Sequence, residues 1–352
     1  MDQLRVVVVG ATGNVGTSVV EALASDPAVN EIVGVARRLP EWDAPKTEWR
    51  AADVETDDLS GLFRGADVVV HLAWLFQPTH DPLTTWRVNV GGSIRVFEAA
   101  AAARVPALVY ASSVGAYSPG PKDRPVDETW PTHSLPTAAY GREKAYVERV
   151  LDSFERDHTD VRVVRMRPAF IFKRQSASEQ RRLFAGPLLP GRLVRPGFIP
   201  VIPDIPGLVF QAVHAADAAD AYRRAVVGDA AGAFNLAAAP VIDAAALAEL
   251  LHARVVPMPR RPVRAVVAAA WHLRLVPADP ALFDLALELP VMDTGRAEAE
   301  LGWKPEYSSL QALSEFLEGL RSAEGMDTPP LEAHAGGPLR VREWVSGVGQ
   351  RP

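Results

Sequence analysis

The sequence of 352 residues contains no cysteine. This absence excludes disulfide bonds, thiolate catalysis and cysteine-ligated metals. It is typical of proteins in a reducing compartment, so we expect a cytoplasmic location. A long apolar run is also lacking: the best candidate, 263–276, contains Arg264 and Arg274 and is shorter than the ~20 residues that a membrane span needs. A predicted strand begins almost at once, so we expect no signal peptide.

Excess positive charge is lacking as well, since the net charge is −6. A basic footprint for nucleic acid is therefore absent, and we expect neither a nucleic-acid nor a membrane partner. Lysine is scarce, which makes a lysine at a motif position more informative than usual. His71, His80 and His133 do not have the spacing of metal ligands, and no serine lies in a Gly-x-Ser-x-Gly turn. We expect no metal site and no serine-nucleophile chemistry.

Short valine-rich runs alternate with helical patterns in the first half of the chain. Such alternation predicts an α/β fold with a doubly wound, parallel Rossmann-type sheet. Residues 209–213, 217–227 and 233–236 are interpreted as a return to that sheet after a loop rich in Pro and Gly. The expected strands are 5–9, 31–36, 68–72, 107–111 and 161–166, and the expected helices are 15–24, 84–103 and 139–154.

This pattern predicts a division of the chain into two interleaved parts and a tail. The dinucleotide-binding part is expected to comprise 1–168 and 207–236. A smaller, mostly helical substrate-binding region is expected to comprise 169–206 and 237–322, where its helices are divided by Pro257, Pro262, Pro277, Pro280 and Pro290. The segment 323–352, which is rich in Pro and Gly, is expected to be a poorly ordered or surface-draped tail.

Three glycines at fixed spacing follow the first strand and open the first helix. Gly10 and Gly13 permit a tight turn and a close approach of the backbone to a pyrophosphate, and Gly16 lets the helix pack on the strand. The free N–H groups of the helix N-terminus then face the phosphates. A plain tight turn is the alternative, but the position between strand and helix favours a dinucleotide site. The expected contacts are Gly10, Thr12, Gly13, Asn14, Val15 and Gly16.

The end of the second strand favours a phosphorylated dinucleotide. NAD enzymes usually place an acid there to bind the ribose hydroxyls. This chain has Ala36 followed by Arg37 and Arg38, and arginine suits a phosphate dianion. We therefore expect NADP, with NAD as the open alternative. Asp53 and Val54 close the third strand and could hold the adenine, although a helix cap explains Asp53 equally well.

Tyr140 and Lys144 lie four residues apart in a predicted helix, which places both on one face. A neighbouring ammonium lowers the pKa of a phenol, whose ordinary value of about 10 is too high for acid–base work at neutral pH. Lys144 and the positive ring of the cofactor could together supply this shift. Ser112 and Ser113 follow the strand 107–111, at the sheet edge where ligands bind, and a hydroxyl there could polarise a carbonyl.

These motifs resemble those of the extended short-chain dehydrogenases/reductases, the NAD-dependent epimerase/dehydratase family, over about 4–320. The resemblance implies that Ser113 supplies the hydroxyl, that Lys144 also holds the nicotinamide ribose, and that paired helices form a homodimer. It implies further cofactor contacts at Leu72, Ala73, Asn89, Pro168 and Ala169. It rests on 10–16, 53–54, 71–73, 89–92, 112–113 with Tyr117, Tyr140 with Lys144, 167–168, 214–217 and 301–305.

Departures from the family pattern point away from nucleotide sugars. Phe170 stands where nucleotide-sugar members usually have Asn, and Lys173 stands where they usually have Gly. The acid pair of the dehydratase branch is replaced by 114–116, which contain no acid. Trp74, Leu75 and Phe76, with Phe170 and Phe172, suggest an apolar substrate, although these residues could equally belong to the core.

Three functions remain open. The first is an NAD(P)-dependent carbonyl reductase or alcohol dehydrogenase in which Tyr140 transfers the proton, Ser113 holds the oxygen and Lys144 tunes Tyr140. The second is an epimerase that uses the same residues and retains its cofactor. The third is a dinucleotide-sensing protein without catalysis, which would not need all three side chains.

Overall fold

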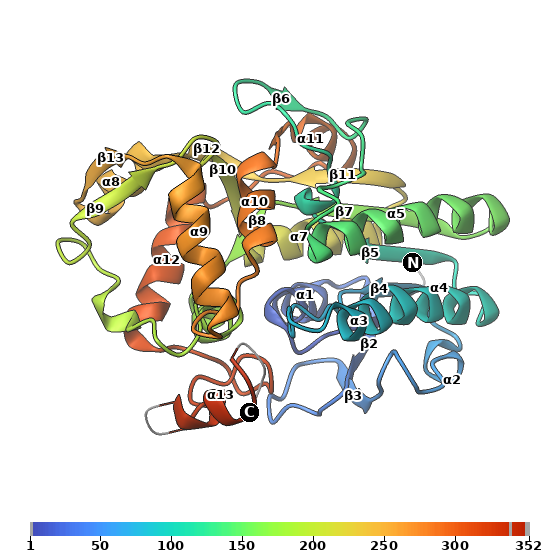
Figure 1. The fold of residues 1–352 in the computed structure, drawn as a ribbon. Coiled ribbons are helices and arrows are strands. Elements are labelled where there is room, and N and C mark those ends of the chain that lie inside the picture. Colours follow the sequence, from blue (N-terminus) through green and yellow to red (C-terminus); the bar gives the residue numbers. More distant parts are fainter. Residues whose placement is uncertain (1–2, 338–339, 349–352) are drawn as a thin grey trace.

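A seven-stranded parallel sheet forms the centre of the computed structural model, which describes residues 3–337 and 340–348. Strand β1 pairs with β2 on one side and with β4 on the other, so the chain order reverses beside β1. Ligands bind at such a reversal point, beyond the carboxyl ends of the strands. This arrangement confirms the predicted fold class (Figure 1). Its order is β11 (Gly232–Leu236), β7 (Arg162–Pro168), β5 (Ala107–Ala111), β4 (Val68–His71), β1 (Leu4–Val9), β2 (Val29–Ala36) and β3 (Thr47–Ala51).

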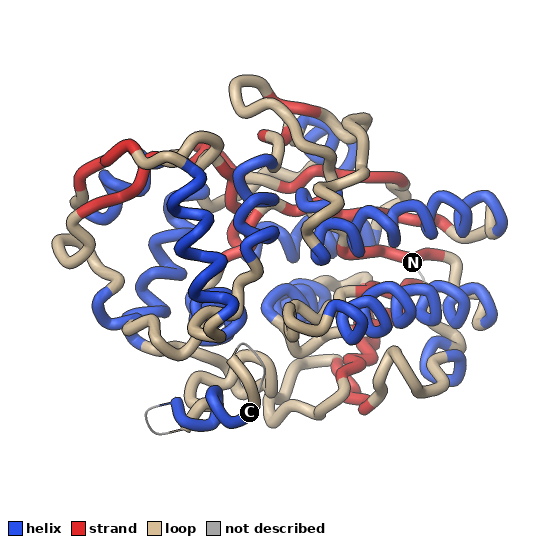
Figure 2. The backbone as a smooth tube through the Cα atoms, viewed as in Figure 1, coloured by secondary structure: helices blue, strands red, loops and turns tan. Residues whose placement is uncertain are grey.

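Helices cover both faces of this sheet, because successive strand side chains point to opposite sides. Val6 and Val8 belong to one core cluster, and Val7 and Val9 belong to another. Figure 2 shows the strands one above another in a view onto the sheet, with helices overlapping them. The first cluster includes residues of α1 (Asn14–Ser25), α7 (Ala215–Val227) and α11 (Gly295–Leu301), and the second includes residues of α2 (Ser60–Phe63), α4 (Gly92–Ala102) and α5 (Ala139–Asp157).

A second region lies beside the carboxyl ends of the strands and contains three small sheets (Figure 1). These are β8 (Phe170–Phe172) with β10 (Phe210–His214) and β12 (Ala238–Ile242), β9 (Val201–Asp204) with β13 (Arg254–Pro257), and β6 (Pro125–Val126) with β14 (Val291–Met292). The helices of the rest of the chain are α6 (Ala177–Gln180), α8 (Ala244–Leu251), α9 (Arg260–His272), α10 (Pro280–Glu288), α12 (Ser309–Ser322) and α13 (Val341–Val345).

The prediction that 209–213 returns to the main sheet is wrong. Strand β10 pairs with β8 and β12 instead, and only 232–236 joins the central sheet. Aromatic packing accompanies this pairing, since the rings of Phe170 and Phe210 are 5.4 Å apart and those of Phe172 and Phe316 are 4.9 Å apart. Both phenylalanines of β8 are therefore held in this small sheet.

The prediction of a single helix over 84–103 is also wrong. It consists of α3 (Pro82–Trp86), a π-helical turn (Arg87–Gly91) and α4. Asp81 caps α3 by accepting from the Thr84 amide, and Pro82 occupies its first turn. The π-helical turn contains Asn89, which is buried and whose amide group binds the backbone of Leu75.

The segment after 323 is packed against the protein, in contrast to the expected tail. Leu331 is fully buried, and Glu343 is buried in an ion pair with Arg181. The Thr328 hydroxyl donates to the carbonyl oxygen of Thr12 in the glycine loop, at 2.9 Å. Apolar burial and charge pairing hold the segment in place. Residues 338–339 and 349–352 of the predicted tail lie outside the described residues.

Candidate active site

The N-terminus of α5 packs closely on the loop that follows β5, and this contact brings Ser113 and Tyr140 together. A Cβ atom at Gly115 would lie 2.7 Å from Cε1 of Tyr140 and 3.3 Å from Oγ of Ser113. A Cβ at Gly141 would lie 1.9 Å from Oγ of Ser134, whose hydroxyl donates to the Gly115 carbonyl. Glycine at 115 and 141 therefore permits the approach of the Tyr140 ring to Ser113.

Ser112 and Ser113 point to different partners. The Ser112 hydroxyl donates to Glu148 at 2.6 Å, whereas the Ser113 hydroxyl accepts from the Gly115 amide at 2.9 Å and is hydrogen-bonded to Tyr140. The structure thus places Ser113 beside the phenol, where the resemblance expected it. Ser112 is instead part of the buried hydrogen-bond network around Glu148.

Lys144 lies one turn after Tyr140 in α5 and is buried. Its Nζ donates to the Ala111 carbonyl at 2.6 Å and lies 3.4 Å from the ring centroid of Trp74. Burial lowers the pKa of Lys144 well below its usual range, while the carboxylates of Glu148 and Glu143 oppose the shift. Lys144 of α5 therefore contacts both the end of β5 and the loop after β4.

The phenol of Tyr140 differs from expectation in its ionisation. Burial raises its pKa to about 12, and the hydrogen bond with Ser113 opposes this rise. Lys144 does not contribute to this shift, and the lowering expected from Lys144 together with the positive ring of the cofactor stays a prediction for the bound state. A phenol of this pKa stays protonated at neutral pH, so Tyr140 is suited to donate a proton.

A network of buried charged side chains lies next to the site. Glu148 is fully buried between Arg165 and Arg167, with N–O distances of 2.9 to 3.0 Å. These guanidinium groups hold the pKa of Glu148 at about 2 against the effect of burial. Arg167 also donates to the Tyr117 hydroxyl, which donates to Asn235. The network joins α5, β7 and β11 to the segment after β5, which also carries Ser113.

The glycine loop has the shape that a dinucleotide requires. Gly10 has φ +87°, and a Cβ there would lie 2.6 Å from the Ala73 amide nitrogen; a Cβ at Gly16 would lie 2.3 Å from the Gly10 carbonyl oxygen. At Gly13 a Cβ would meet only the Gly10 oxygen, at 3.7 Å, so its outer side is open to a phosphate. Gly13 precedes α1, and Asn14 and Val15 open that helix. The residues present therefore fit the cofactor.

The other expected cofactor residues divide into two groups. Arg37 and Arg38 are exposed at the end of β2, and Leu72 and Ala73 follow β4 beside the glycine loop. The remaining side chains have structural partners. Asp53 accepts from the Glu55 amide, Val54 packs at Gly92, Asn89 binds Leu75 and Glu143, Asn14 donates to the Ile171 carbonyl, Pro168 ends β7, and Ala169 is buried.

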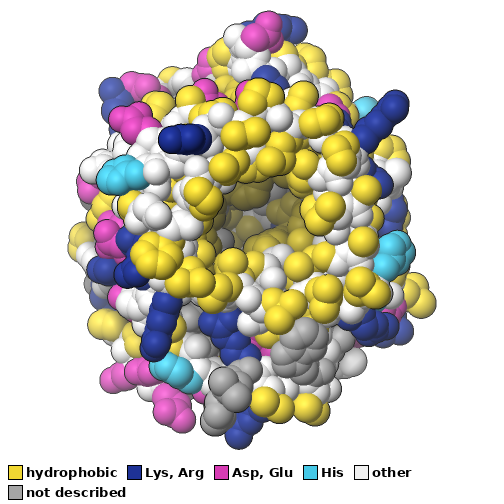
Figure 3. All heavy atoms as spheres, turned by 60° about the vertical axis from the view of Figure 1, so that its left-hand side comes forward, with side chains coloured by type: hydrophobic (Ala, Val, Ile, Leu, Met, Phe, Trp, Pro, Cys, Tyr) yellow, Lys and Arg dark blue, Asp and Glu magenta, His cyan; other side chains and the backbone are white. Residues whose placement is uncertain are grey.

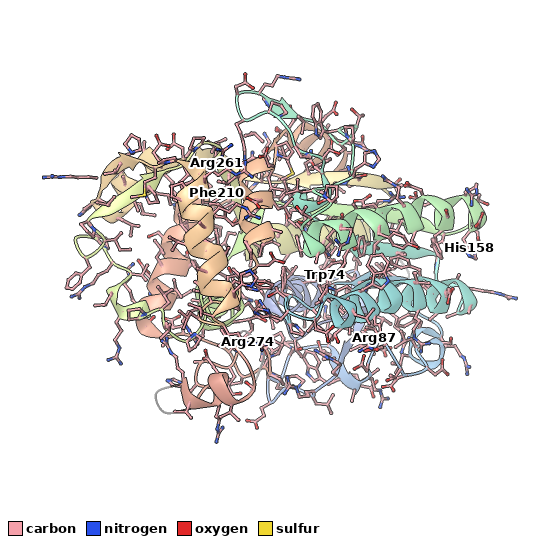
Figure 4. All side chains as sticks on the ribbon, viewed as in Figure 1. Trp74, Arg87, His158, Phe210, Arg261 and Arg274 are labelled. Carbon is pink, nitrogen blue, oxygen red and sulfur yellow. The ribbon has the colours of Figure 1, made fainter. Side chains whose placement is uncertain are left out.

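A pocket lined mainly by apolar and aromatic side chains opens above Tyr140. The Tyr140 ring stacks on the Phe76 ring, with their centroids 5.1 Å apart, and lies edge-on to the Trp74 ring, with centroids 5.9 Å apart. Figure 4 shows Trp74 between the sheet and the second region. Of the predicted aromatics, Trp74 and Phe76 line the pocket, whereas Phe170 and Phe172 do not. The lining is Trp74, Leu75, Phe76, Gln77, Thr79, Pro82, Thr85, Ala138, Ala139, Tyr140, Glu143, Phe184, Asp279 and Leu282.

Sequence reasoning missed Glu143, Phe184 and Leu282 as pocket residues. Glu143 is buried and accepts from Thr85 and Asn89 at 2.7 Å each, and burial raises its pKa. Its position three residues after Tyr140, on the same helix face, was a usable signal. No local pattern points to Phe184 or Leu282, which reach the pocket only through folding of the second region.

The match to a known family covers residues 6–185, which include the glycine loop, Ser113, Tyr140 and Lys144. The matching description is the NAD-dependent epimerase/dehydratase family. This chain belongs to that family. Solved structures agree in fold: UDP-glucose 4-epimerase from Thermus thermophilus, in complex with NAD, superposes with a TM-score of 0.67 at 22% identity, over 91% of this chain and 100% of that one.

Relatives within the family have different activities. An uncharacterised protein of Mycobacterium tuberculosis is 26% identical over 98% of this chain and 90% of its own length. L-arabinose 1-dehydrogenase (NAD(P)(+)) of Haloferax volcanii is 41% identical over 31% of this chain and 41% of that protein. The decarboxylating sterol-4-alpha-carboxylate 3-dehydrogenase of Candida albicans is 32% identical over 47% of this chain and 50% of that protein. Family members thus include NAD-dependent dehydrogenases and epimerases.

Proposed function

We propose that this protein is an NAD(P)-dependent oxidoreductase that reduces a carbonyl, or oxidises the corresponding alcohol, in an apolar substrate. The observation that carries the proposal is the placement of Ser113, Tyr140 and Lys144 at one sheet edge, below a pocket walled by Trp74 and Phe76. When bound, the nicotinamide supplies or accepts the hydride. Tyr140 donates the proton to the carbonyl oxygen, and Ser113 orients that oxygen.

The pocket lining favours this reaction over a nucleotide-sugar epimerase. A substrate diphosphate requires cationic or backbone N–H partners. The described residues that line the pocket include two carboxylates, Glu143 and Asp279, and neither lysine nor arginine. Epimerisation remains the second candidate because the fold is shared with UDP-sugar epimerases.

A change in nicotinamide absorbance distinguishes the oxidoreductase from the epimerase. The purified protein is offered NADPH with a panel of aryl and alicyclic ketones, and separately offered UDP-sugars without added reductant. We expect absorbance loss that depends on an apolar ketone. Interconversion of UDP-sugars without a net absorbance change would establish the epimerase instead, and inertness toward both classes would favour a sensor.

We propose that the protein prefers NADP(H) to NAD(H). Arg37 and Arg38 are exposed where the adenosine ribose of a bound cofactor is expected, and hydrogen bonds to a charged group contribute ~1.5–3 kcal/mol. The preference is expected to be about tenfold or more. Dissociation constants for both cofactors, measured at one ionic strength, test it. Arg38→Ser should reduce the preference, while Arg156→Ser, on the exposed end of α5, should not; equal or tighter NAD binding refutes the proposal.

Lys144→Ala is expected to weaken cofactor binding and lower the rate together. Its ammonium contacts the Ala111 carbonyl and the Trp74 ring, at the place where we propose that the nicotinamide ribose binds. In the direction of alcohol oxidation Tyr140 acts as the base, and burial alone raises its pKa to about 12. We propose that Lys144 and the positive ring of the bound cofactor together lower this pKa, so the rate of the variant should approach that of the wild type as pH rises. A pH-independent defect would contradict the tuning role.

We propose a homodimer formed through α4 and α5. Apolar side chains are exposed on α5 and on α3, which precedes α4 in the chain: Leu83 of α3 is 63% exposed, and Tyr146 of α5 is 45% exposed with its ring 4.9 Å from that of Trp86 of α3. Two-fold pairing would cover these side chains. Sedimentation velocity at micromolar concentration should show a dimer, and Tyr146→Glu should shift it toward monomer. A clean wild-type monomer would refute the pairing.

A further inference from the structure

Helix α9 presents apolar side chains to solvent. Pro262, Ala265, Val266, Ala269 and Leu273 occur at the i, i+3, i+4, i+7, i+11 spacing that forms one helical stripe, and all five are exposed. Val266 is 69% exposed and Leu273 is 70% exposed. Surface helices ordinarily turn the polar side outward. The outer side of α9 thus departs from this pattern, and the stripe has no cover within the part of the chain that the structure describes.

The opposite side of α9 explains this orientation. Arg264 pairs with Asp284 of α10 at 2.6 Å, and Arg260 pairs with Asp284 and Glu288. Trp271 donates through its indole nitrogen to Thr79 at 2.9 Å. These polar contacts, together with the half-buried side chains of Val263, Val267 and Trp271, hold the opposite side of the helix against the protein, so the apolar stripe faces outward.

Two neighbouring segments extend the stripe into a larger apolar face. The loop 187–200 leads into β9, and β9 pairs with β13, which precedes α9. Figure 3 shows hydrophobic side chains gathered around and inside a hollow on this side of the molecule. We define the apolar face by its exposed large side chains: Leu188, Leu193, Phe198, Val255, Val256, Val266, Leu273 and Leu275.

Positive charge accompanies this face although the chain as a whole is acidic. No Asp or Glu occurs in the sequence between Glu179 and Asp204, or between Glu249 and Asp279. Arg261 and Arg274 lie at opposite ends of α9 (Figure 4). The exposed arginines of the two segments that have no carboxylate partner among the described ion pairs are Arg192, Arg195, Arg254, Arg261 and Arg274. The surface therefore combines apolar side chains with cations.

The apolar face adjoins the pocket above Tyr140. Trp271 of α9 binds Thr79 and stacks on His80 at 4.0 Å. Thr79 and Gln77 line the pocket, and the Gln77 amide donates to the carbonyls of Leu183 and Pro277, which flank the two segments. An apolar molecule that reaches the face is thus next to the pocket.

We propose that the apolar face docks on the surface of a lipid bilayer that contains anionic lipids. The exposed Val, Leu and Phe side chains enter the boundary between head groups and acyl chains, and the arginines bind the phosphates. The proposal departs from the expectation of no membrane partner, which was drawn from the net charge of the whole chain and from the lack of a spanning segment. Docking differs from spanning: no helix among the described residues is both long and apolar enough to cross a membrane. A second copy of the chain would bring arginines against arginines, so charge favours an anionic partner. The proposal concerns binding and is independent of the reaction proposed above.

Flotation of the full-length protein with vesicles tests the proposal. We expect it to float with vesicles of phosphatidylcholine plus phosphatidylglycerol, less with phosphatidylcholine alone, and less as salt rises. The pair Val266→Asp and Leu273→Asp should lower partitioning at least about tenfold, since the apolar burial of two side chains is lost. Arg261→Ser and Arg274→Ser should each lower it about fivefold.

Matched controls separate docking from misfolding. Val227→Asp on α7, with a side chain that is 37% exposed, and Arg156→Ser on α5 lie outside the face and should float like the wild type. All variants should retain the wild-type circular dichroism spectrum and cofactor affinity. Absence of wild-type flotation at low salt would overturn the proposal, as would equal flotation of the α9 variants. Dissociation of an oligomer by the Asp pair, without vesicle binding, would instead identify an interface between copies.

Discussion

Tyr140→Phe is expected to lower turnover by about 10²- to 10⁴-fold, the usual contribution of a positioned acid or base. The cofactor dissociation constant should remain nearly unchanged. The ring is held by Phe76, Trp74 and the loop at Gly115, and these contacts do not involve the hydroxyl. Only the proton and the hydrogen bond with Ser113 are lost. Steady-state rates on a substrate identified by the absorbance panel, with fluorescence titration of the cofactor, measure both quantities.

Tyr146→Phe is the matched control, because it removes a phenol from the same helix at an exposed position. It should keep wild-type turnover. The pH profile adds a second readout: the pKa of Tyr140 is about 12, so the phenol stays protonated and carbonyl reduction should show no titration of Tyr140 across neutral pH. Turnover of Tyr140→Phe close to that of the wild type would show that the proton comes from another group, and Glu143 would then be tested next.

Glu148→Gln is expected to destabilise the fold by about 3–5 kcal/mol, the usual cost of removing one partner from a buried ion pair. The carboxylate is fully buried, and its removal leaves Arg165 and Arg167 without their shared counter-ion. Urea unfolding at neutral pH measures the change. Asp152→Asn is the control, because Asp152 binds Arg165 from a half-exposed position and should contribute at most about 1 kcal/mol.

The same variant has a defined pH dependence. The folded-state pKa of Glu148 is about 2, below its ordinary value of 4.5. A carboxylate with a lowered pKa stabilises the fold fully above its unfolded-state pKa, and this stability is lost as pH falls through the folded-state pKa. The difference between wild type and Glu148→Gln should therefore shrink from about pH 4.5 toward pH 2. A constant difference over that window would show that the charge of Glu148 is not the cause.

Local patterns determined the parts of this protein that depend on short stretches of chain. The glycines at 10 and 16 identify the first turn, because a Cβ at either position would collide with backbone atoms. The spacing of Tyr140 and Lys144 places them on one side of a helix wherever that helix packs. Valine-rich runs identified the parallel strands, and parallel order then implied that Ser113 and Tyr140 would meet at one edge.

Tertiary structure decided whatever depends on residues far apart in the chain. The partners of Asn89 are Leu75 and Glu143, and Glu148 lies between two arginines of β7; no local pattern contains these pairs. Burial, which exists only in the folded chain, raises the pKa of Tyr140, an effect that the spacing of Tyr140 and Lys144 in the sequence does not reveal. The Thr328 hydroxyl binds a carbonyl oxygen of the glycine loop, which lies near the other end of the sequence. The α9 stripe faces outward because ion pairs with α10 and half-buried apolar side chains hold the other side of the helix against the protein. Sequence periodicity indicates that a helix has an apolar side, but the packing of its neighbours decides which side meets the solvent.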